Sequence, residues 1–164
     1  MAKTVGIGYQ DFEKVREKDL FYVDKTGFIR EWWENEDEVT LIIRPRRFGK
    51  TLNMSMLEKF FSVQYTGRED LFREFVIWED EKYRNLQGTY PVISLSFANV
   101  KETTYQTTVQ RINRIITNLY NDHRFLLESE LLSGEEKNYF LEITEGMPKV
   151  TATMAIHQLS KFLY

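Results

Sequence analysis

The sequence has no cysteine, only two histidines and few residues that interrupt helices and strands. Its 164 residues include 3 prolines and 8 glycines. Without cysteine there is no disulfide scaffold, no thiol nucleophile and no thiolate site for zinc or an iron–sulfur cluster. His123 and His157 offer little basis for a histidine-rich metal site or a catalytic triad.

Long hydrophobic runs are also missing. No segment approaches the roughly 18 apolar residues that a transmembrane helix needs, and the N-terminus lacks the apolar core of a signal peptide. We therefore expect a cytoplasmic protein with no membrane partner. The net charge is −3, so no general basic field points to nucleic acid. With 42% hydrophobic and 15% aromatic residues, the composition is typical of one globular domain.

Two apolar runs predict strands. Residues 39–43 read Val-Thr-Leu-Ile-Ile, and residues 92–97 follow Pro91 with a similar pattern. Such runs are typical of strands buried on both faces of a parallel sheet. Because helical patterns lie between and after them, the alternation predicts an α/β fold with a parallel sheet.

Apolar residues at helical spacing predict the helices. Ser133 and Glu136 form a capping-box pattern that opens a helix ending near Gly146. Asp24, after the run Leu20–Val23, is interpreted as the cap of an early helix rather than as a metal ligand. The other expected helical ranges are 25–34, 50–62, 69–75, 80–86, 104–122 and 151–164.

The segment between the first strand and its helix carries the chemistry. Residues 44–51 read Arg-Pro-Arg-Arg-Phe-Gly-Lys-Thr, which matches the end of the phosphate-binding pattern G-x-x-x-x-G-K-[ST] but has Arg44 where the first glycine stands. Gly49 allows a close approach of the backbone to an anion. The start of the following helix adds a positive dipole end. The segment therefore predicts a phosphate-binding loop.

Roles within this loop follow from residue chemistry. Lys50 can reach the β- and γ-phosphates of a nucleotide, and the Thr51 hydroxyl can ligate Mg²⁺. Residues 39–57 contain no acid, so an anion would meet a locally positive segment. The predicted nucleotide-binding residues are Arg46, Arg47, Phe48, Gly49, Lys50, Thr51 and Leu52. Within this set, Arg46 and Arg47 are as compatible with solvated side chains as with phosphate contacts. Phe48 could stack on adenine, but burial against the predicted sheet is the favoured interpretation.

At these residues the sequence resembles the bacterial AAA-ATPase-like proteins. The resemblance rests on residues 44–57, on Phe-Tyr-Val-Asp-Lys-Thr at 21–26 and on Tyr-Pro-Val-Ile-Ser-Leu at 90–95. It spans about residues 5–164, and members of that family often carry arginine at the position of Arg44. The resemblance implies a three-layer P-loop NTPase-like fold, with ATP and Mg²⁺ as cofactors. Many members continue into a PD-(D/E)XK nuclease-like domain, which would supply a nucleic-acid partner.

The family pattern continues to a Walker B strand that ends in Asp-Glu, and this chain ends before such a strand. The fold is therefore expected to be incomplete, with residues 1–164 forming the N-terminal part of one P-loop domain. Because that strand normally supplies the acids for hydrolysis, we expect nucleotide binding without useful ATP turnover, and self-association of the chain through uncovered apolar surface.

Two alternative functions are compatible with the same residues. The loop can belong to an interaction or sensor module that does not hydrolyse nucleotide. It can also contact nucleic acid through its arginines, although the basic residues are confined to one short segment of an acidic chain. The leading hypothesis is an ATP-binding domain whose nucleotide binding or hydrolysis is coupled to a downstream effector.

Overall fold

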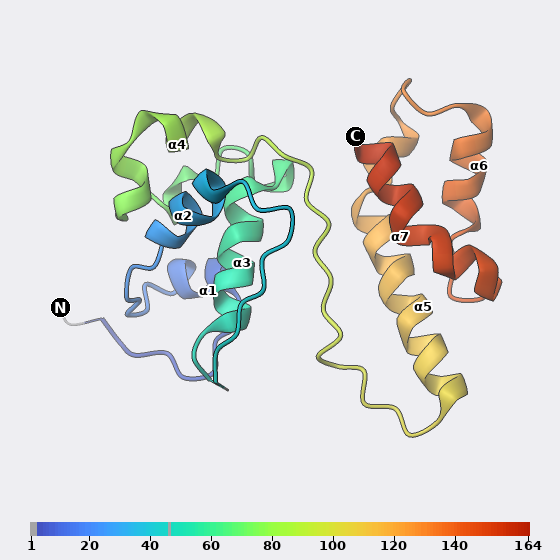
Figure 1. Ribbon diagram of the computed structural model, residues 1–164, viewed down its shortest axis with the longest axis horizontal. Coiled ribbons are helices and arrows are strands. Elements are labelled where there is room, and N and C mark those ends of the chain that lie inside the picture. The colour runs from blue at the N-terminus through green and yellow to red at the C-terminus, as the bar shows by residue number, and fades with distance from the viewer. Residues whose placement is uncertain (1–2, 46) are drawn as a thin grey trace. The chain divides into compact units, whose positions relative to one another are not determined.

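The computed structural model describes residues 3–45 and 47–164. The chain forms two compact units, residues 1–92 and residues 93–164. Each unit is built from helices around its own hydrophobic core (Figure 1). Within the described residues no helix is long and apolar enough to cross a membrane.

Helices and short 3-10 turns make up both units. The first unit contains α1 (Phe12–Glu17), α2 (Gly27–Asn35), α3 (Lys50–Phe61), η1 (Val63–Tyr65), η2 (Glu69–Leu71), η3 (Val76–Glu79) and α4 (Glu81–Leu86). The second contains α5 (Tyr105–Asp122), η4 (Arg124–Leu127), α6 (Gly134–Glu142) and α7 (Lys149–Leu163). The expected helices at 25–34, 50–62, 104–122 and 151–164 are confirmed with ends shifted by one or a few residues.

The predicted α/β fold, a three-layer P-loop NTPase-like arrangement with a parallel sheet, is wrong. Over the described residues the chain is 55% helix and 1% strand, and its β contact is an isolated bridge between Ser62 and Tyr90. Residues 39–43 are extended, yet Val39, Leu41 and Ile43 are 86%, 78% and 83% exposed. A strand is held by hydrogen bonds to a neighbouring strand, and no described segment pairs with this one.

The second predicted strand, residues 92–97, is also extended without a partner strand. Its apolar side chains instead support the two helical cores. Val92 packs against the core of the first unit, whereas Ile93 and Leu95 pack against that of the second. The apolar pattern therefore predicted correctly that these side chains make core contacts. It could not predict whether a neighbouring strand is present to pair with the backbone.

Burial of one face of α3 organises the first unit. Met56 and Phe60 are fully buried and lie one helical turn apart, against a core that includes Phe12 and Ile29. The helix is also tied by polar contacts: the Phe12 N–H donates to Ser55 Oγ at 3.0 Å. These contacts fix α3 in the core of the first unit.

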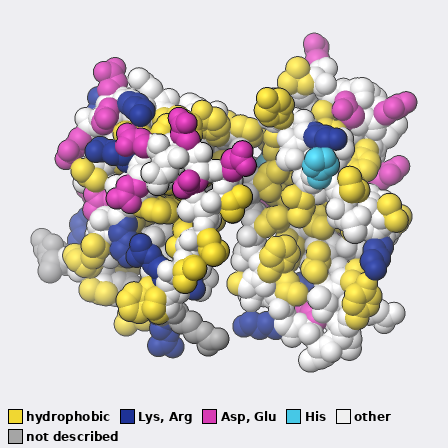
Figure 2. Space-filling view, viewed as in Figure 1, with side chains coloured by type: hydrophobic (Ala, Val, Ile, Leu, Met, Phe, Trp, Pro, Cys, Tyr) yellow, Lys and Arg dark blue, Asp and Glu magenta, His cyan; other side chains and the backbone are white. Residues whose placement is uncertain are grey.

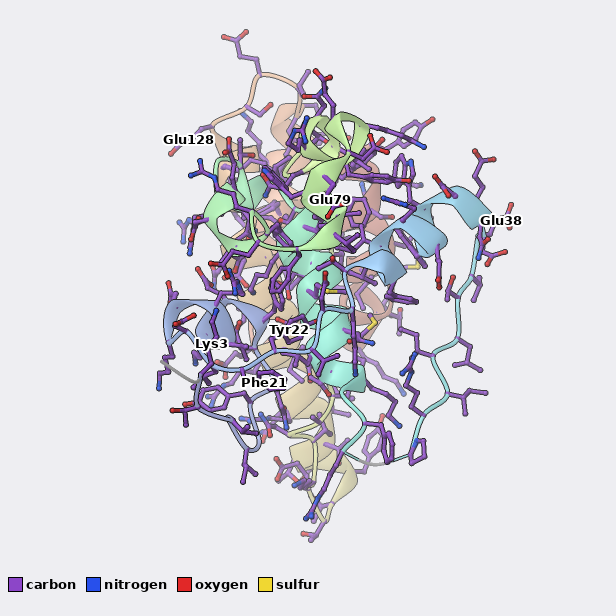
Figure 3. The ribbon with its side chains drawn as sticks, turned by 90° about the vertical axis from the view of Figure 1, so that its left-hand side faces the viewer. Lys3, Phe21, Tyr22, Glu38, Glu79 and Glu128 are labelled. Atoms are coloured by element: carbon purple, nitrogen blue, oxygen red, sulfur yellow. The ribbon has the colours of Figure 1, made fainter. Side chains whose placement is uncertain are left out.

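Tyr22 adds a contact to the same helix. Its hydroxyl donates to the sulfur of Met56 at 3.3 Å, and Figure 3 shows the residue beside α3. Burial, together with the nearby Asp24 carboxylate, raises the pKa of Tyr22 above its ordinary value. The hydroxyl therefore stays protonated at neutral pH and remains a donor.

The start of α2 is held against η3. Asp24 Oδ1 accepts from the N–H and the hydroxyl of Thr26, at 2.8 and 2.7 Å, and Asp24 Oδ2 accepts from the N–H of Val76 at 2.9 Å. Thr26 is fully buried, and its hydroxyl oxygen accepts from the N–H of Ile77 at 3.3 Å. The predicted role of Asp24 as the helix cap is wrong: the N-cap of α2 is Thr26, no side chain caps the helix, and Asp24 instead accepts from the N–H of Thr26.

The second unit is centred on the contact between α5 and α7. Buried Leu119 and Leu159 belong to its core, and the Tyr120 hydroxyl donates to the carbonyl of Ala155 at 2.8 Å. Tyr105, at the start of α5, is 69% exposed, whereas Ile116 and Leu119 farther along the helix are buried.

Local hydrogen bonds are found at the ends of two helices in this unit. The capping box of Ser133 and Glu136 is present at the start of α6, with both of its hydrogen bonds. The helix ends at Glu142, earlier than the expected Gly146. His123 is buried at the C-terminal end of α5, where its Nδ1 lies 2.8 Å from the carbonyl oxygen of Leu119. These residues have structural roles.

The depth of α3 in its core predicts different effects for two methionines of that helix. Met56 is fully buried and Met54 is 56% exposed. Met56→Ala should lower the free energy of unfolding by about 2–5 kcal/mol because it leaves a cavity, and Met54→Ala should change it by less than about 0.5 kcal/mol. Chemical denaturation followed by circular dichroism measures both. Equal losses would contradict the burial of this face.

Candidate functional site

The loop before α3 turns sharply at two residues in the left-handed region. Arg47 has φ 69° and Gly49, the N-cap of the helix, has φ 75° and ψ 19°. Glycine adopts this conformation without cost, whereas an L-residue such as Arg47 pays on the order of 1–3 kcal/mol, a departure that clusters at binding loops. Between them the N–H of Phe48 points back to the carbonyl of Pro45 at 3.4 Å.

The first turn of α3 has N–H groups available to a ligand. Gly49 has no side chain to cap the helix, and the first hydrogen bond of the helix runs from the N–H of Asn53 to the carbonyl of Gly49 at 2.9 Å. Among the described residues no acceptor meets the N–H groups of Lys50, Thr51 and Leu52. These donors and the helix dipole favour an anion at this end.

Lys50 spans the loop. Its ammonium donates to the carbonyl oxygen of Arg44 at 2.7 Å, six residues earlier. Because of this bond, the Lys50 side chain folds back toward the start of the loop instead of extending away from it. The lysine is exposed, so an incoming anion can reach its ammonium group.

The other predicted site residues lie in different surroundings. Thr51 is exposed in the first turn of α3, and Leu52 is half-buried against the core of the first unit. Phe48 is 60% exposed, so its predicted burial against a sheet is wrong, since there is no sheet for it to cover. Arg47 is exposed, and Arg46 lies outside the described residues.

Lys25 also belongs to this region, although the motif did not predict it. Its Nζ lies 3.7 Å from the position that a Cβ would take on Gly49. The residue is half-buried and is 24 positions earlier in the chain, at the start of α2. A pattern based on local spacing has no signal for such a contact, because the tertiary structure creates it.

A buried polar atom without a partner lies one turn into α3. Asn53 is 2% exposed, and its Oδ1 accepts no hydrogen bond among the described residues. The residue follows Gly49 by four positions, and Cα–Cβ bonds in a helix tilt toward the N-terminus. Its side chain therefore extends on the Gly49 side of the helix, where a ligand with a donor would satisfy it.

Acidic side chains lie mainly elsewhere on the first unit. In Figure 2 they gather over the end that carries α4, whereas the end with the loop shows basic and hydrophobic side chains. Glu38 lies at the end of residues 39–43 remote from α3 (Figure 3). Among the described residues no carboxylate lies within 4.0 Å of the ammonium of Lys25 or Lys50. The loop is therefore electrostatically suited to an anion.

The donor set fits a phosphate better than a bare metal ion. The described residues contain no group of three or more His, Asp or Glu side chains that could hold a metal. Mg²⁺, however, is commonly held by one or two protein oxygens together with substrate phosphates. The exposed hydroxyl of Thr51 is such an oxygen, so the residues present fit a phosphate–Mg²⁺ group rather than an independent cation.

A turn that opens a helix with Gly-Lys-Thr, with unpaired N–H groups and cations beside them, defines a candidate phosphate-binding loop. The chain belongs to the AAA-ATPase-like family, described as "Predicted AAA-ATPase", whose model matches residues 6–157. The expected family resemblance is thereby confirmed. Membership supports ATP binding as the coarse function.

One curated relative shares part of this sequence. It is described as "Uncharacterized protein in vnfD 5'region" of Azotobacter chroococcum mcd 1, and it is 38% identical over 96 residues. The match covers 58% of this chain and 17% of that protein, so the chain spans a small part of the relative's length. No solved structure matches the chain.

The hydrogen bonds of Asp24 predict a structural role for its carboxylate. Asp24→Asn replaces one carboxylate oxygen by an NH₂ group, which cannot accept the hydrogen bond from the N–H of Val76 or of Thr26. The substitution should therefore lower the free energy of unfolding by about 1 kcal/mol. Asp37→Asn, in the exposed segment after α2, serves as the matched control and should be neutral. Thermal or urea unfolding measures both. If the two variants are equally stable, Asp24 does not hold α2 against η3.

Proposed function

We propose that the loop before α3 binds the phosphates of ATP. The observation that carries the proposal is the bond from Lys50 Nζ to the Arg44 carbonyl. This bond holds the Lys50 ammonium over the loop. The N–H groups of Lys50, Thr51 and Leu52, which follow the loop, have no acceptor among the described residues. A phosphate would replace that carbonyl as the partner of the lysine and accept from the same N–H groups.

Each residue of the segment would have a distinct role. Gly49 lets the backbone approach the phosphates, Lys50 neutralises the β- and γ-phosphates, and Thr51 supplies a hydroxyl to Mg²⁺. The Arg47 side chain adds positive charge near the entrance of the loop. Phe48, with its exposed ring, is available to stack on the base. The Thr51 hydroxyl would help to hold Mg²⁺, which when bound would supply neutralising charge to the phosphates.

The proposal for residues 1–164 is nucleotide binding rather than turnover. Hydrolysis needs an acidic group to hold the metal and orient the attacking water, and no described carboxylate lies within 4.0 Å of the ammonium of Lys25 or Lys50. In a longer protein we propose that ATP binding is coupled to an effector, with a PD-(D/E)XK nuclease-like domain as the candidate suggested by the family resemblance.

The charge of Lys50 provides the direct test. Lys50→Ala should weaken ATP binding by at least about tenfold, because it removes a charge-assisted contact to phosphate. Isothermal titration calorimetry with ATP and Mg²⁺ measures the affinity. The matched control is Lys14→Ala on α1, an exposed lysine without a carboxylate within 4.0 Å among the described residues.

Two outcomes of that titration would contradict the proposal. The first is a wild-type chain that binds neither ATP nor GTP. The second is equal ATP affinity for wild type, Lys50→Ala and Lys14→Ala, which would locate any nucleotide site away from the loop. Circular dichroism spectra of the variants check that α3 is retained.

The hydroxyl of Thr51 provides a separate test of the metal. Thr51→Val keeps the shape of the side chain but removes the oxygen, so it should weaken ATP binding in the presence of Mg²⁺ more than in its absence. Thr51→Ser keeps the hydroxyl and should behave like the wild type. The measurement is a pair of titrations, with Mg²⁺ and with a chelator. Losses of the same size in both would remove Thr51 as a metal ligand.

A further inference from the structure

We propose that Lys25 is a second phosphate-binding cation of this site, supplied by the start of α2 rather than by the loop. The inference rests on the proposed function of the loop. Its basis is the position of the Lys25 Nζ, 3.7 Å from where a Cβ on Gly49 would lie. An anion close enough to contact the backbone at Gly49 is therefore within reach of this ammonium.

The backbone of Lys25 is fixed on both sides. Asp24 accepts hydrogen bonds from Thr26 and from the N–H of Val76. Thr26 is fully buried and accepts from the N–H of Ile77. The lysine is thus presented from an anchored turn, and only its side chain has to adjust when a ligand binds. Such anchoring limits the conformational entropy that binding would cost.

The ammonium is also uncommitted. Among the described residues it has no carboxylate within 4.0 Å and donates no hydrogen bond of its own. Some lysines of the first unit are paired, such as Lys3 with Asp19 and Lys82 with Glu34, whereas Lys14 has no carboxylate within 4.0 Å among the described residues but is exposed. A half-buried cation without a counter-charge is stabilised when an anion binds close to it.

Asn53 is a second feature of this end of α3, one helical turn beyond Gly49. The residue is 2% exposed and its Oδ1 has no partner in the described structure. Buried acceptors are normally satisfied by protein, water or ligand. Asn53 Oδ1 is an acceptor and would need a donor such as water or an ammonium, because a phosphate oxygen cannot supply one.

The test compares Lys25 with the loop lysine and with a remote one. Lys25→Met removes the charge and keeps much of the side-chain length, and Lys50→Met and Lys14→Met are matched variants. Calorimetry with ATP and with inorganic tripolyphosphate, each without Mg²⁺, measures binding to the phosphates directly. We expect Lys25→Met to weaken both by about tenfold, Lys25→Arg to recover part of the loss and Lys14→Met to match the wild type.

The outcomes separate this inference from the proposed function. If Lys50→Met loses affinity while Lys25→Met binds both compounds like the wild type, Lys25 is not a phosphate ligand and the loop assignment stands. If the wild-type chain binds neither compound, both proposals fail. If Lys25→Met weakens binding of both compounds and its circular dichroism spectrum is unchanged, the inference is supported.

A measurement on the wild-type chain covers the case in which the variant does not fold. Amine acetylation followed by mass spectrometry reports the reactivity of each lysine with and without saturating ATP. Lys25 and Lys50 should be protected by the nucleotide, and Lys14 should react equally in both samples. Unchanged reactivity of Lys25, with Lys50 protected, would overturn the inference.

Discussion

Burial of the inner face of α3 is the constraint on which the candidate site depends. Met56 and Phe60 anchor the helix in the core of residues 1–92, and Ser55 ties it to the start of α1. Because the C-terminal part of α3 is buried, its N-terminal turn has a fixed place at the surface. The N–H groups of that turn can therefore be aimed at a ligand without ordering a flexible segment.

A second constraint acts on the cations around that turn. Lys50 belongs to α3 itself and bonds back to the Arg44 carbonyl, whereas Lys25 arrives from the anchored start of α2. The two charges thus come from different elements: the Lys50 ammonium is held by a backbone carbonyl, and the Lys25 ammonium has no hydrogen bond or counter-ion among the described residues. Neither charge is neutralised by a described carboxylate, which is a physical reason for the site to favour an anion such as phosphate.

The local features of the site were predictable from the sequence, and the sheet around it was not. Gly49, Lys50 and Thr51 specify a helix start, since glycine adopts the left-handed cap and the following residues accept helical geometry. Val39 to Ile43 have strand-like composition, but pairing depends on another segment with free N–H and C=O groups at the right distance. Phe48 was misjudged for the same reason, because its expected burial presupposed that sheet.

The sequence by itself determined where most helices lie, where α6 is capped and which loop carries Gly-Lys-Thr, because these depend on residues within a few positions of one another. Only the tertiary structure decided that Lys25 meets Gly49 and that Asn53 is buried without a partner. It also decided that residues 39–43 remain extended and exposed. Such outcomes depend on which distant segments pack together, and the spacing of residues along the chain does not encode that choice locally.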